Sequence, residues 1–353
     1  MPCHFFYEFF GKFKNLTKLN LYCSAVDDVG FRAIGENCNK LVDLNAGGTW
    51  ISNEGIKYLS IEDAMIPGIT DQYRLQNLAL IDLSDARVSP PGLSLLLACH
   101  PGLVKIEHKE TFHAFELIQS QQCSRSYQDL KFKLKQLSTT DIFITPDKYE
   151  FALDRCPFVE SVTITSAGLA NDNLYKLMTL KHLTQLHLGN KNCVSFNFHE
   201  GVAPVLDAVG ANLKKLVLED FTEVDVDYIG DKCPNVVHLA LSGILTYAPI
   251  GQLNPHYFNK LSSLELWNKI GLNHELAICQ NTLKQLLYRS PLTYLLLQRI
   301  ANLTDELMEE ILQMNPLLTL RNVVIDYCHN VTGKIFWMFL GKTKLIISTG
   351  FLF

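Results

Sequence analysis

The chain has 353 residues, more than one hydrophobic core usually supports, so it holds either several domains or an architecture that grows by repetition. Its 31 Lys and Arg residues against 36 Asp and Glu residues give a net charge of −5, which offers no basic surface to nucleic acid or anionic membranes. With 48% hydrophobic and 19% charged residues, the composition predicts an ordered core and excludes long disordered stretches.

The sequence shows no pattern typical of a membrane span, a secretory signal or a cysteine-based site. No apolar run reaches the roughly 18 to 20 residues that a bilayer span needs. The aromatic N-terminus carries Glu8 and has no basic stretch before it, which is unlike a secretory signal. The ten cysteines form no C-x-x-C pair, so a zinc or redox motif is not indicated. We therefore expect a cytoplasmic or nuclear protein that binds neither membrane nor nucleic acid.

The feature that organises the chain is a six-residue frame with apolar residues at its first, fourth and sixth positions, as in LKKLVL from Leu213. It recurs every 23 to 37 residues, which is the period of a solenoid. The frames begin at Leu16, Leu41, Leu78, Leu103, Leu134, Val159, Leu183, Leu213, Val236, Leu261, Leu292 and Leu320, with the copies at Leu103 and Leu134 the weakest.

A second signal follows many frames and predicts the start of a helix. An apolar residue comes about ten residues after the frame begins, followed by Asp, Ser or Thr residues that favour the N-cap and then by Gly or a substitute. The six copies begin at Val26, Ile51, Val88, Leu169, Val224 and Leu303. The spacing places these residues on the inner helix faces: Phe31, Ile34, Ile56, Leu59, Leu307, Ile311 and Leu312.

Cysteines recur near the ends of the predicted helices, often beside a proline that ends the helix. The positions are Cys38, Cys99, Cys156, Cys233 and Cys279, and Cys328 fits the same interpretation. A thiol at such a place acts as a small hydrophobic residue, so we predict packing rather than chemistry.

Together these signals resemble the cysteine-containing leucine-rich repeats, whose unit reads L-x-x-L-x-L-x-x-C-x-x-I-T-D-x-G-L with a later C-P-x-L. The resemblance covers residues from about 14 to 335. It implies an α/β leucine-rich-repeat solenoid, a horseshoe with a concave parallel β-sheet and helices on the convex side. The best-known members are F-box/leucine-rich-repeat proteins, the substrate-receiving subunits of cullin-RING ubiquitin ligases.

We divide the chain into three parts. Residues 1–13 contain five phenylalanines at helical spacing and are expected to be a partial helix of a preceding repeat. Residues 14–346 form a solenoid of about 12 units with insertions near 60–77, 107–131 and 244–260, and 347–353 are a C-terminal tail. Asn254 and Pro255 predict a short helix in the third insertion. Since no F-box precedes Leu16, we expect a fragment or truncated product, or ends covered by another chain.

Alternate residues of each strand must point out of the sheet, away from the core. We select as the candidate concave binding face Tyr22, Asp43, Asp82, His187, Glu219, His238, Glu265, Trp267, Tyr294 and Asp326. Tyr22, Trp267 and Tyr294 are predicted to be exposed and to act as binding hot spots, because rigid amphipathic side chains dominate such sites. The alternative is a polar sheet surface with occasional aromatic residues.

Catalytic and metal-binding motifs are not indicated. His108 and His113 lie near Glu107, Glu110 and Glu116, but a His-x4-His spacing does not place two imidazoles on one helical face. A solvated charged insertion is the favoured interpretation of this segment. The sequence has no phosphate-binding glycine loop, no dinucleotide fingerprint and no H-E-x-x-H or G-x-S-x-G motif. We predict no enzyme activity, no catalytic residue, no metal and no cofactor.

The repeat therefore predicts a protein-interaction module that holds a protein substrate or target on its concave face. The resemblance implies substrate recognition for an SCF-type ubiquitin ligase in ubiquitin-dependent degradation, with a Skp adaptor and cullin as partners only if a longer product carries an F-box. The alternative is an F-box-less inhibitor or regulatory scaffold. A receptor ectodomain would need a signal peptide and disulfide-bonded caps, which the sequence does not show.

Overall fold

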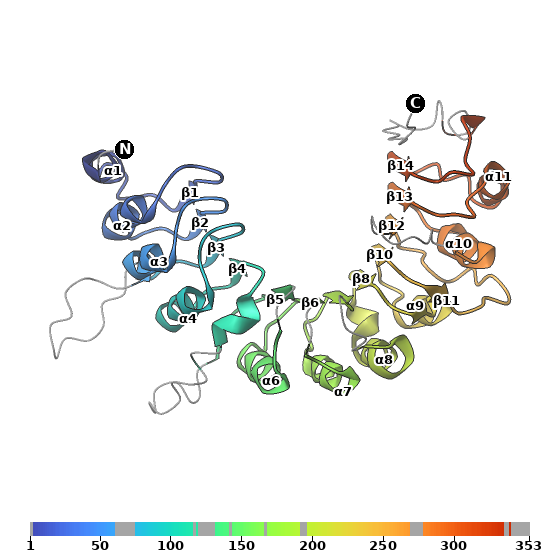
Figure 1. Ribbon diagram of the computed structural model, residues 1–353, viewed down its shortest axis with the longest axis horizontal. Coiled ribbons are helices and arrows are strands. Elements are labelled where there is room, and N and C mark those ends of the chain that lie inside the picture. The colour runs from blue at the N-terminus through green and yellow to red at the C-terminus, as the bar shows by residue number, and fades with distance from the viewer. Residues whose placement is uncertain are drawn as a thin grey trace. The chain divides into compact units, whose positions relative to one another are not determined.

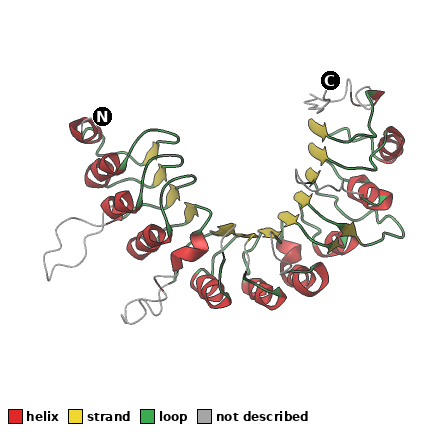
Figure 2. Ribbon diagram, viewed as in Figure 1, coloured by secondary structure: helices red, strands yellow, loops and turns green. Residues whose placement is uncertain are grey.

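The computed structural model describes residues 3–60, 75–115, 118, 131–140, 143–165, 168–190, 196–268, 278–334 and 339. The chain divides into two compact units, Met1–Ile164 (unit 1) and Thr165–Phe353 (unit 2). Each unit repeats a short strand, a turn and a helical segment, as Figures 1 and 2 show.

Each of the twelve predicted frames contains a β-strand. Unit 1 holds β1 (Lys18–Asn20), β2 (Asp43–Asn45), β3 (Leu80–Asp82), β4 (Lys105–Glu107) and β5 (Gln136–Thr140), and β6 (Ser161–Thr165) lies at its boundary. Unit 2 holds β7 (Gln185–Gly189), β8 (Lys215–Glu219), β10 (His238–Ser242), β12 (Ser263–Trp267), β13 (Tyr294–Gln298) and β14 (Asn322–Asp326). Two short strands, β9 (Glu223–Val224) and β11 (Thr246–Tyr247), lie outside the frames and pair with each other.

Helices follow the strands where the second signal predicts them. Unit 1 contains α1 (Cys3–Phe10), α2 (Asp28–Asn37), α3 (Asn53–Ser60), α4 (Pro90–Cys99), the 3-10 helix η1 (Thr111–His113) and α6 (Pro146–Arg155). Unit 2 contains α7 (Asn171–Leu174), the 3-10 helix η3 (Tyr175–Thr179), the π-helix η4 (Phe198–Val202), α8 (Ala203–Val209), the 3-10 helix η5 (Gly210–Asn212), α9 (Val226–Lys232), α10 (Gln280–Leu287) and α11 (Asp305–Met314). The sequence therefore located the six helix starts for which the second signal is present.

The frame strands pair in parallel with their neighbours along the chain. In unit 1 the order is β1-β2-β3-β4, and in unit 2 it is β7-β8-β10-β12-β13-β14. Within unit 2 the helices lie on the opposite side of the chain from these strands (Figures 1 and 2). The fold is an α/β leucine-rich-repeat solenoid, as the sequence predicts.

The core lies between strands and helices and is built from the frame positions. In the β8 frame Leu213, Leu216 and Leu218 are fully buried, and the same holds for Leu41 and Leu44 in the β2 frame. The predicted inner helix faces are buried as well, except that Leu312 is only half-buried. Burying apolar positions of every repeat against the next one gives a continuous core that no repeat could form alone.

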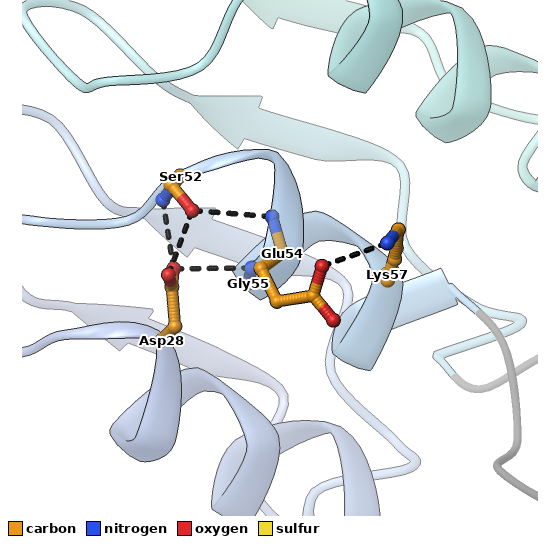
Figure 3. Close-up of polar contacts among 5 residues, drawn as sticks. All are labelled: Asp28, Ser52, Glu54, Gly55 and Lys57. Atoms are coloured by element: carbon orange, nitrogen blue, oxygen red, sulfur yellow. Dashed lines mark hydrogen bonds and ion pairs between the residues drawn. The ribbon is translucent and has the colours of Figure 1, made fainter.

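Successive helices of unit 1 are tied by side-chain hydrogen bonds at their N-termini. Asp28, at the start of α2, accepts hydrogen bonds from the backbone N–H of Ser52 (2.8 Å) and Gly55 (3.0 Å) and from the Ser52 hydroxyl (2.7 Å) (Figure 3). The Ser52 hydroxyl in turn accepts from the N–H of Glu54 at 3.1 Å. One carboxylate therefore takes up amides at the start of the next repeat's helix, which would otherwise lack partners.

The same contact recurs elsewhere in both units. Asn53 accepts from the N–H of Ser89 at 2.9 Å, Asn171 from the N–H of Asn197 at 3.0 Å, and Asp305 from the N–H of Thr332 at 3.1 Å. These hydrogen bonds between successive repeats, called here the inter-repeat caps, were not predicted. The sequence indicates caps within one helix, whereas the acceptor here comes from the preceding repeat.

A residue with a left-handed backbone follows many of the frame strands, one to three residues after the strand ends. Seven residues after the frame begins, φ is between +51° and +63° at Cys23, Gly48, Asp85, Asp220, Gly243, Arg299 and Tyr327. Five of these are not glycine, although a side chain disfavours this conformation. Gly48, Gly243, Asp85 and Asp220 suit this conformation locally, whereas Cys23, Arg299 and Tyr327 do not, so at these three the stacking of repeats imposes the turn.

The cysteine interpretation holds for five of six positions. Cys38, Cys99, Cys156, Cys233 and Cys328 are buried. Burial raises the pKa of the Cys38 thiol to about 11, so this thiol stays protonated at neutral pH and serves as packing. Cys279 is exposed, and the packing prediction for it was wrong. It precedes α10 instead of following a helix, and Ile278 fills the core position beside it.

The predicted insertions fall partly outside the described residues. Residues 61–74, 116–117 and 119–130 of the first two insertions, and the tail 347–353, belong to the undescribed part. The third insertion, 244–260, forms turns after β11, not the short helix that we expected. Asn254 instead exchanges hydrogen bonds with the side chain of Gln285 on α10, at 2.6 and 2.9 Å. Tertiary contacts thus replace the local helical preference of the Asn-Pro pair.

At the N-terminal end, α1 forms the helix expected within residues 1–13. Phe10 is buried, whereas Phe5, Phe9 and Phe13 are exposed. The Phe5 and Phe9 rings stack along the helix, and the Phe13 ring, just beyond its end, contacts Phe9 at a tilt. Among the described residues, none of the helices is long and apolar enough to cross a membrane.

His100, which follows α4, makes the stability of unit 1 depend on pH. It is 4% exposed, and burial lowers the pKa of its imidazole from 6.5 to about 4. The unfolded chain therefore binds the proton more readily, and the free energy of unfolding falls as the pH drops from about 6.5 towards 4.

We predict that His100→Leu removes part of this acid sensitivity. When the pH falls from 7 to 4.5, the free energy of unfolding of the wild-type protein should decrease by about 2 to 3 kcal/mol more than that of the variant. Urea unfolding of both proteins at the two pH values measures this difference, and each protein serves as its own reference. An equal decrease in the free energy of unfolding of both proteins would show that folding does not lower the pKa of His100.

Candidate functional site

The strand face of unit 2 is the set of strand residues that point away from the core. The register aligns them in three rows across β7, β8, β10, β12, β13 and β14. The first row is Gln185, Lys215, His238, Ser263, Tyr294 and Asn322; the second is His187, Val217, Ala240, Glu265, Leu296 and Val324; the third is Gly189, Glu219, Ser242, Trp267, Gln298 and Asp326.

This face alternates with buried residues along every strand. On β12 the order is Ser263, Leu264, Glu265, Leu266 and Trp267, and both leucines are fully buried while the other three are half-buried. The alternation is what a parallel sheet with one face on the core requires. Side chains that are 23 to 31 residues apart in sequence therefore lie on neighbouring strands, about 4.8 Å apart in the sheet.

The ten predicted residues fall into two sets. Seven of them belong to the strand face of unit 2: His187, Glu219, His238, Glu265, Trp267, Tyr294 and Asp326. The other three, Tyr22, Asp43 and Asp82, lie in unit 1. Tyr22 is 57% exposed just after β1. Asp43 pairs with Lys18 at 3.3 Å, and Asp82 accepts from the N–H of Ser84 at 2.9 Å, so both carboxylates already have local partners.

The aromatic residues of unit 2 are less exposed than predicted. Trp267 and Tyr294 are half-buried, not exposed. Their neighbours on adjacent strands explain the difference, since each outward residue of an inner strand is flanked on both sides. Tyr22, which stands beside β1 at the edge of the unit 1 sheet, has a neighbouring strand on one side only and stays exposed.

Three carboxylates lie on the strand face, and two of them have a close partner. His187 Nε2 lies 3.0 Å from Glu219 Oε1. Gln298 donates a hydrogen bond from Nε2 to Asp326 Oδ2 at 2.9 Å. Both pairs join adjacent strands, as the register of β7 with β8 and of β13 with β14 requires.

Glu265, the third carboxylate, is arranged differently. Its nearest partner is His238, whose Nε2 lies 3.8 Å from Glu265 Oε1. Burial raises the pKa of Glu265, and the positive charge of Lys215 opposes that rise. Burial, with a smaller contribution from Lys215, lowers the pKa of His238 to about 4, so this imidazole is neutral at pH 7 and gives Glu265 no positive charge.

Two aromatic residues border Glu265. Trp267 is two residues further along the same strand, and Tyr294 is a diagonal neighbour on β13. Burial raises the pKa of Tyr294, and the Glu265 carboxylate raises it further, which places the two groups within electrostatic reach of each other. The site can therefore accept hydrogen bonds at Glu265 and offers two ring systems beside it.

The middle row is a feature that the sequence interpretation missed. Val217, Ala240, Leu296 and Val324 are apolar, and Glu265 is the row's one carboxylate. The signal was present, because these residues all occupy the fifth position of their frames. It was overlooked because outward positions were expected to be polar.

The histidine and carboxylate segment near β4 also differs from expectation. His108 and His113 are buried and not part of a solvated insertion. His108 Nδ1 accepts from the N–H of Glu110 at 3.1 Å, and His113 Nε2 lies 3.0 Å from the carbonyl oxygen of Phe143. Within the described ranges, no group of three or more His, Cys, Asp or Glu side chains has the geometry of a metal site.

No protein-family model matches the chain, and no curated protein matches its sequence. Solved structures with a similar fold include the TLR13–ssRNA13 complex, at 15% identity and TM-score 0.43, which covers 99% of this chain and 49% of that chain. The chain thus spans about half the length of TLR13. Others are yeast Rad7 with Elc1 (14% identity, TM-score 0.39, covering 98% and 92%) and internalin C2 of Listeria monocytogenes (12% identity, TM-score 0.36, covering 73% and 83%).

Proposed function

We propose that the protein is an interaction module that binds a protein partner on the strand face of unit 2. The observation that carries this proposal is the composition of that face: four of the six residues of its middle row are apolar and half-buried or buried, and Trp267, Tyr294 and polar side chains border them. Protein interfaces have such an apolar centre with aromatic anchors and a polar rim. The buried leucines beneath hold the face rigid, which lowers the entropy cost of binding.

The first test replaces the aromatic anchors. The double variant Trp267→Ala and Tyr294→Ala should weaken binding of the partner by about 100-fold or more, because each hot-spot aromatic contributes about 2 kcal/mol or more. The partner is first recovered by affinity purification of the tagged chain from cells of its own source, and binding is then measured with both proteins purified. The third predicted anchor, Tyr22, is tested separately as Tyr22→Ala, since it belongs to unit 1.

The control for this test is Tyr175→Ala. Tyr175 is an exposed tyrosine of the same unit that lies on η3, among the helices. It should leave the affinity unchanged within about twofold, since truncation outside an interface is usually neutral. If Tyr175→Ala weakened binding as much as the double variant, or if the double variant bound normally, the strand face would not be the binding surface.

We further propose, on the resemblance of the repeats, that the partner is a substrate of an SCF-type ubiquitin ligase. A Skp adaptor and cullin would then be recovered with the product of the native transcript, together with an F-box upstream of Met1. A single stoichiometric partner without ligase subunits would favour the alternative, an inhibitor or regulatory scaffold that blocks its partner's own site.

A further inference from the structure

We propose that the partner inserts an arginine side chain between Trp267 and Tyr294, where its guanidinium pairs with the Glu265 carboxylate. This inference rests on the proposed function, because it names the chemistry that the strand face of unit 2 recognises.

The first step is that Glu265 has no donor of its own. Among the described residues none donates a hydrogen bond to its carboxylate, and His238 Nε2 lies 3.8 Å away. The other two carboxylates of the face, Glu219 and Asp326, have neighbours at 3.0 and 2.9 Å. Glu265 is therefore the carboxylate of this face that is open to a donor from outside.

The second step is that Glu265 is partly removed from water. Its side chain is 28% exposed, and its neighbours in the middle row, Ala240 and Leu296, are apolar. A half-buried anion without a close cation is costly, and a cation from a partner removes that cost. The attraction is also stronger here than at an exposed site, because the surroundings are less polar than water.

The third step is that no residue in the described part of the chain supplies that cation. Lys215 lies on β8, two strands away from β12, which is about 10 Å at the usual strand spacing. Its field lowers the pKa of Glu265 but does not offset the effect of burial. His238 is neutral at pH 7 because burial holds its pKa at about 4. The described residues around Glu265 therefore leave its charge without a close cation.

The fourth step is the choice of arginine. Trp267 is two residues after Glu265 on β12, and Tyr294 is its diagonal neighbour on β13, so an aromatic residue stands on each of two sides of Glu265 in the sheet register. A guanidinium is planar, pairs with a carboxylate through two parallel N–H donors and stacks on aromatic faces. It therefore uses the carboxylate and both rings together, and a cation over an indole gains a further attraction.

The test compares two peptides that differ in charge and not in shape. The pentapeptide Ala-Ala-Arg-Ala-Ala, with blocked ends, and its citrulline counterpart are titrated into the full chain. Binding is followed by the NMR signal of the Trp267 indole N–H, assigned with Trp267→Phe. We expect a saturable shift with the arginine peptide and at least fivefold weaker binding of the citrulline peptide. Equal binding of the two peptides, or no shift with either, would overturn the inference.

Two variants make the test specific. Glu265→Gln should abolish the preference for arginine, whereas Asp326→Asn, which removes a negative charge from the same face, should retain it. A preference that survived Glu265→Gln would place the arginine elsewhere. If Trp267→Ala with Tyr294→Ala lost the cellular partner while the arginine preference was absent, the proposed function would stand and this inference would fail.

Discussion

Gly55→Ala is expected to destabilise unit 1 by about 3 kcal/mol, although alanine normally stabilises a helix relative to glycine by up to about 1 kcal/mol. Gly55 lies in the first turn of α3, and a Cβ there would come 2.5 Å from Asp28 Oδ1 and 2.6 Å from Ile51 Cγ1. Relieving this overlap moves the carboxylate off the amides of Ser52 and Gly55. The loss of a partly buried, charge-assisted contact, together with the clash against Ile51, outweighs the gain in helix propensity.

Urea unfolding of the wild-type chain and the variant measures this effect. Gly102→Ala is the matched control, because nothing lies within 4 Å of a Cβ at that position, and it should change the free energy of unfolding by less than about 0.5 kcal/mol. The double variant Asp28→Ala and Gly55→Ala should lose less unfolding free energy than the two single variants lose in total, since both substitutions remove the same contact. If Gly55→Ala stabilised the protein, the inter-repeat cap at Asp28 would not contribute to stability as described.

Leu216→Ala is expected to destabilise unit 2 by about 2 to 5 kcal/mol. Leu216 is the fully buried fourth residue of the β8 frame, and its register neighbours are Leu186 on β7 and Leu239 on β10. Truncation leaves a cavity inside a layer of leucines that a rigid sheet cannot close. Because each repeat is stabilised chiefly by its neighbours, the loss extends to the repeats on both sides.

The control for this prediction is Leu245→Ala, at a leucine of the same unit that is 63% exposed. It should change stability by less than about 0.5 kcal/mol. The two variants are compared by thermal and urea unfolding. Similar losses at both positions would mean that the frame leucines do not form the core.

The strands were the best-predicted part of the fold. Each frame predicts a strand through apolar residues at fixed positions, such as Leu213, Leu216 and Leu218 in the β8 frame. A strand lies at each of the twelve frames. The helix starts were predicted nearly as well, because N-cap residues such as Asp27 and Thr304 accept hydrogen bonds from the first turn, here from the N–H of Gly30 and of Leu307. These features depend on local sequence and on periodic burial, which a single sequence displays.

The features that were missed depend on contacts between repeats. The hydrogen bond that Ser52 donates to Asp28 joins residues 24 apart, and the left-handed φ of Arg299 or Tyr327 has no local signal. Cys279 is exposed because Ile278 fills the core position beside it, and 244–260 forms turns because Asn254 bonds to Gln285 on α10. Tertiary packing decides such positions against local preference.

The candidate site shows the same division. The sequence placed seven residues on one face of unit 2, and the register aligns them there. It did not separate Glu265 from Glu219 or Asp326, because all three occupy outward positions of their strands. Their difference lies in the neighbouring strand: His187 and Gln298 reach two of the carboxylates, whereas His238 stays 3.8 Å from the third.

Site-specific photo-crosslinking in cells of the source tests the central claim, that the strand face of unit 2 binds a protein. The photo-reactive residue p-benzoylphenylalanine is placed at Ser263, between His238 and Tyr294 on the strand face, and separately at Met178, exposed on η3 among the helices. We expect a defined crosslinked protein from Ser263 and none from Met178. Crosslinking from Met178 without any from Ser263 would contradict the claim and place the interaction on the helical side.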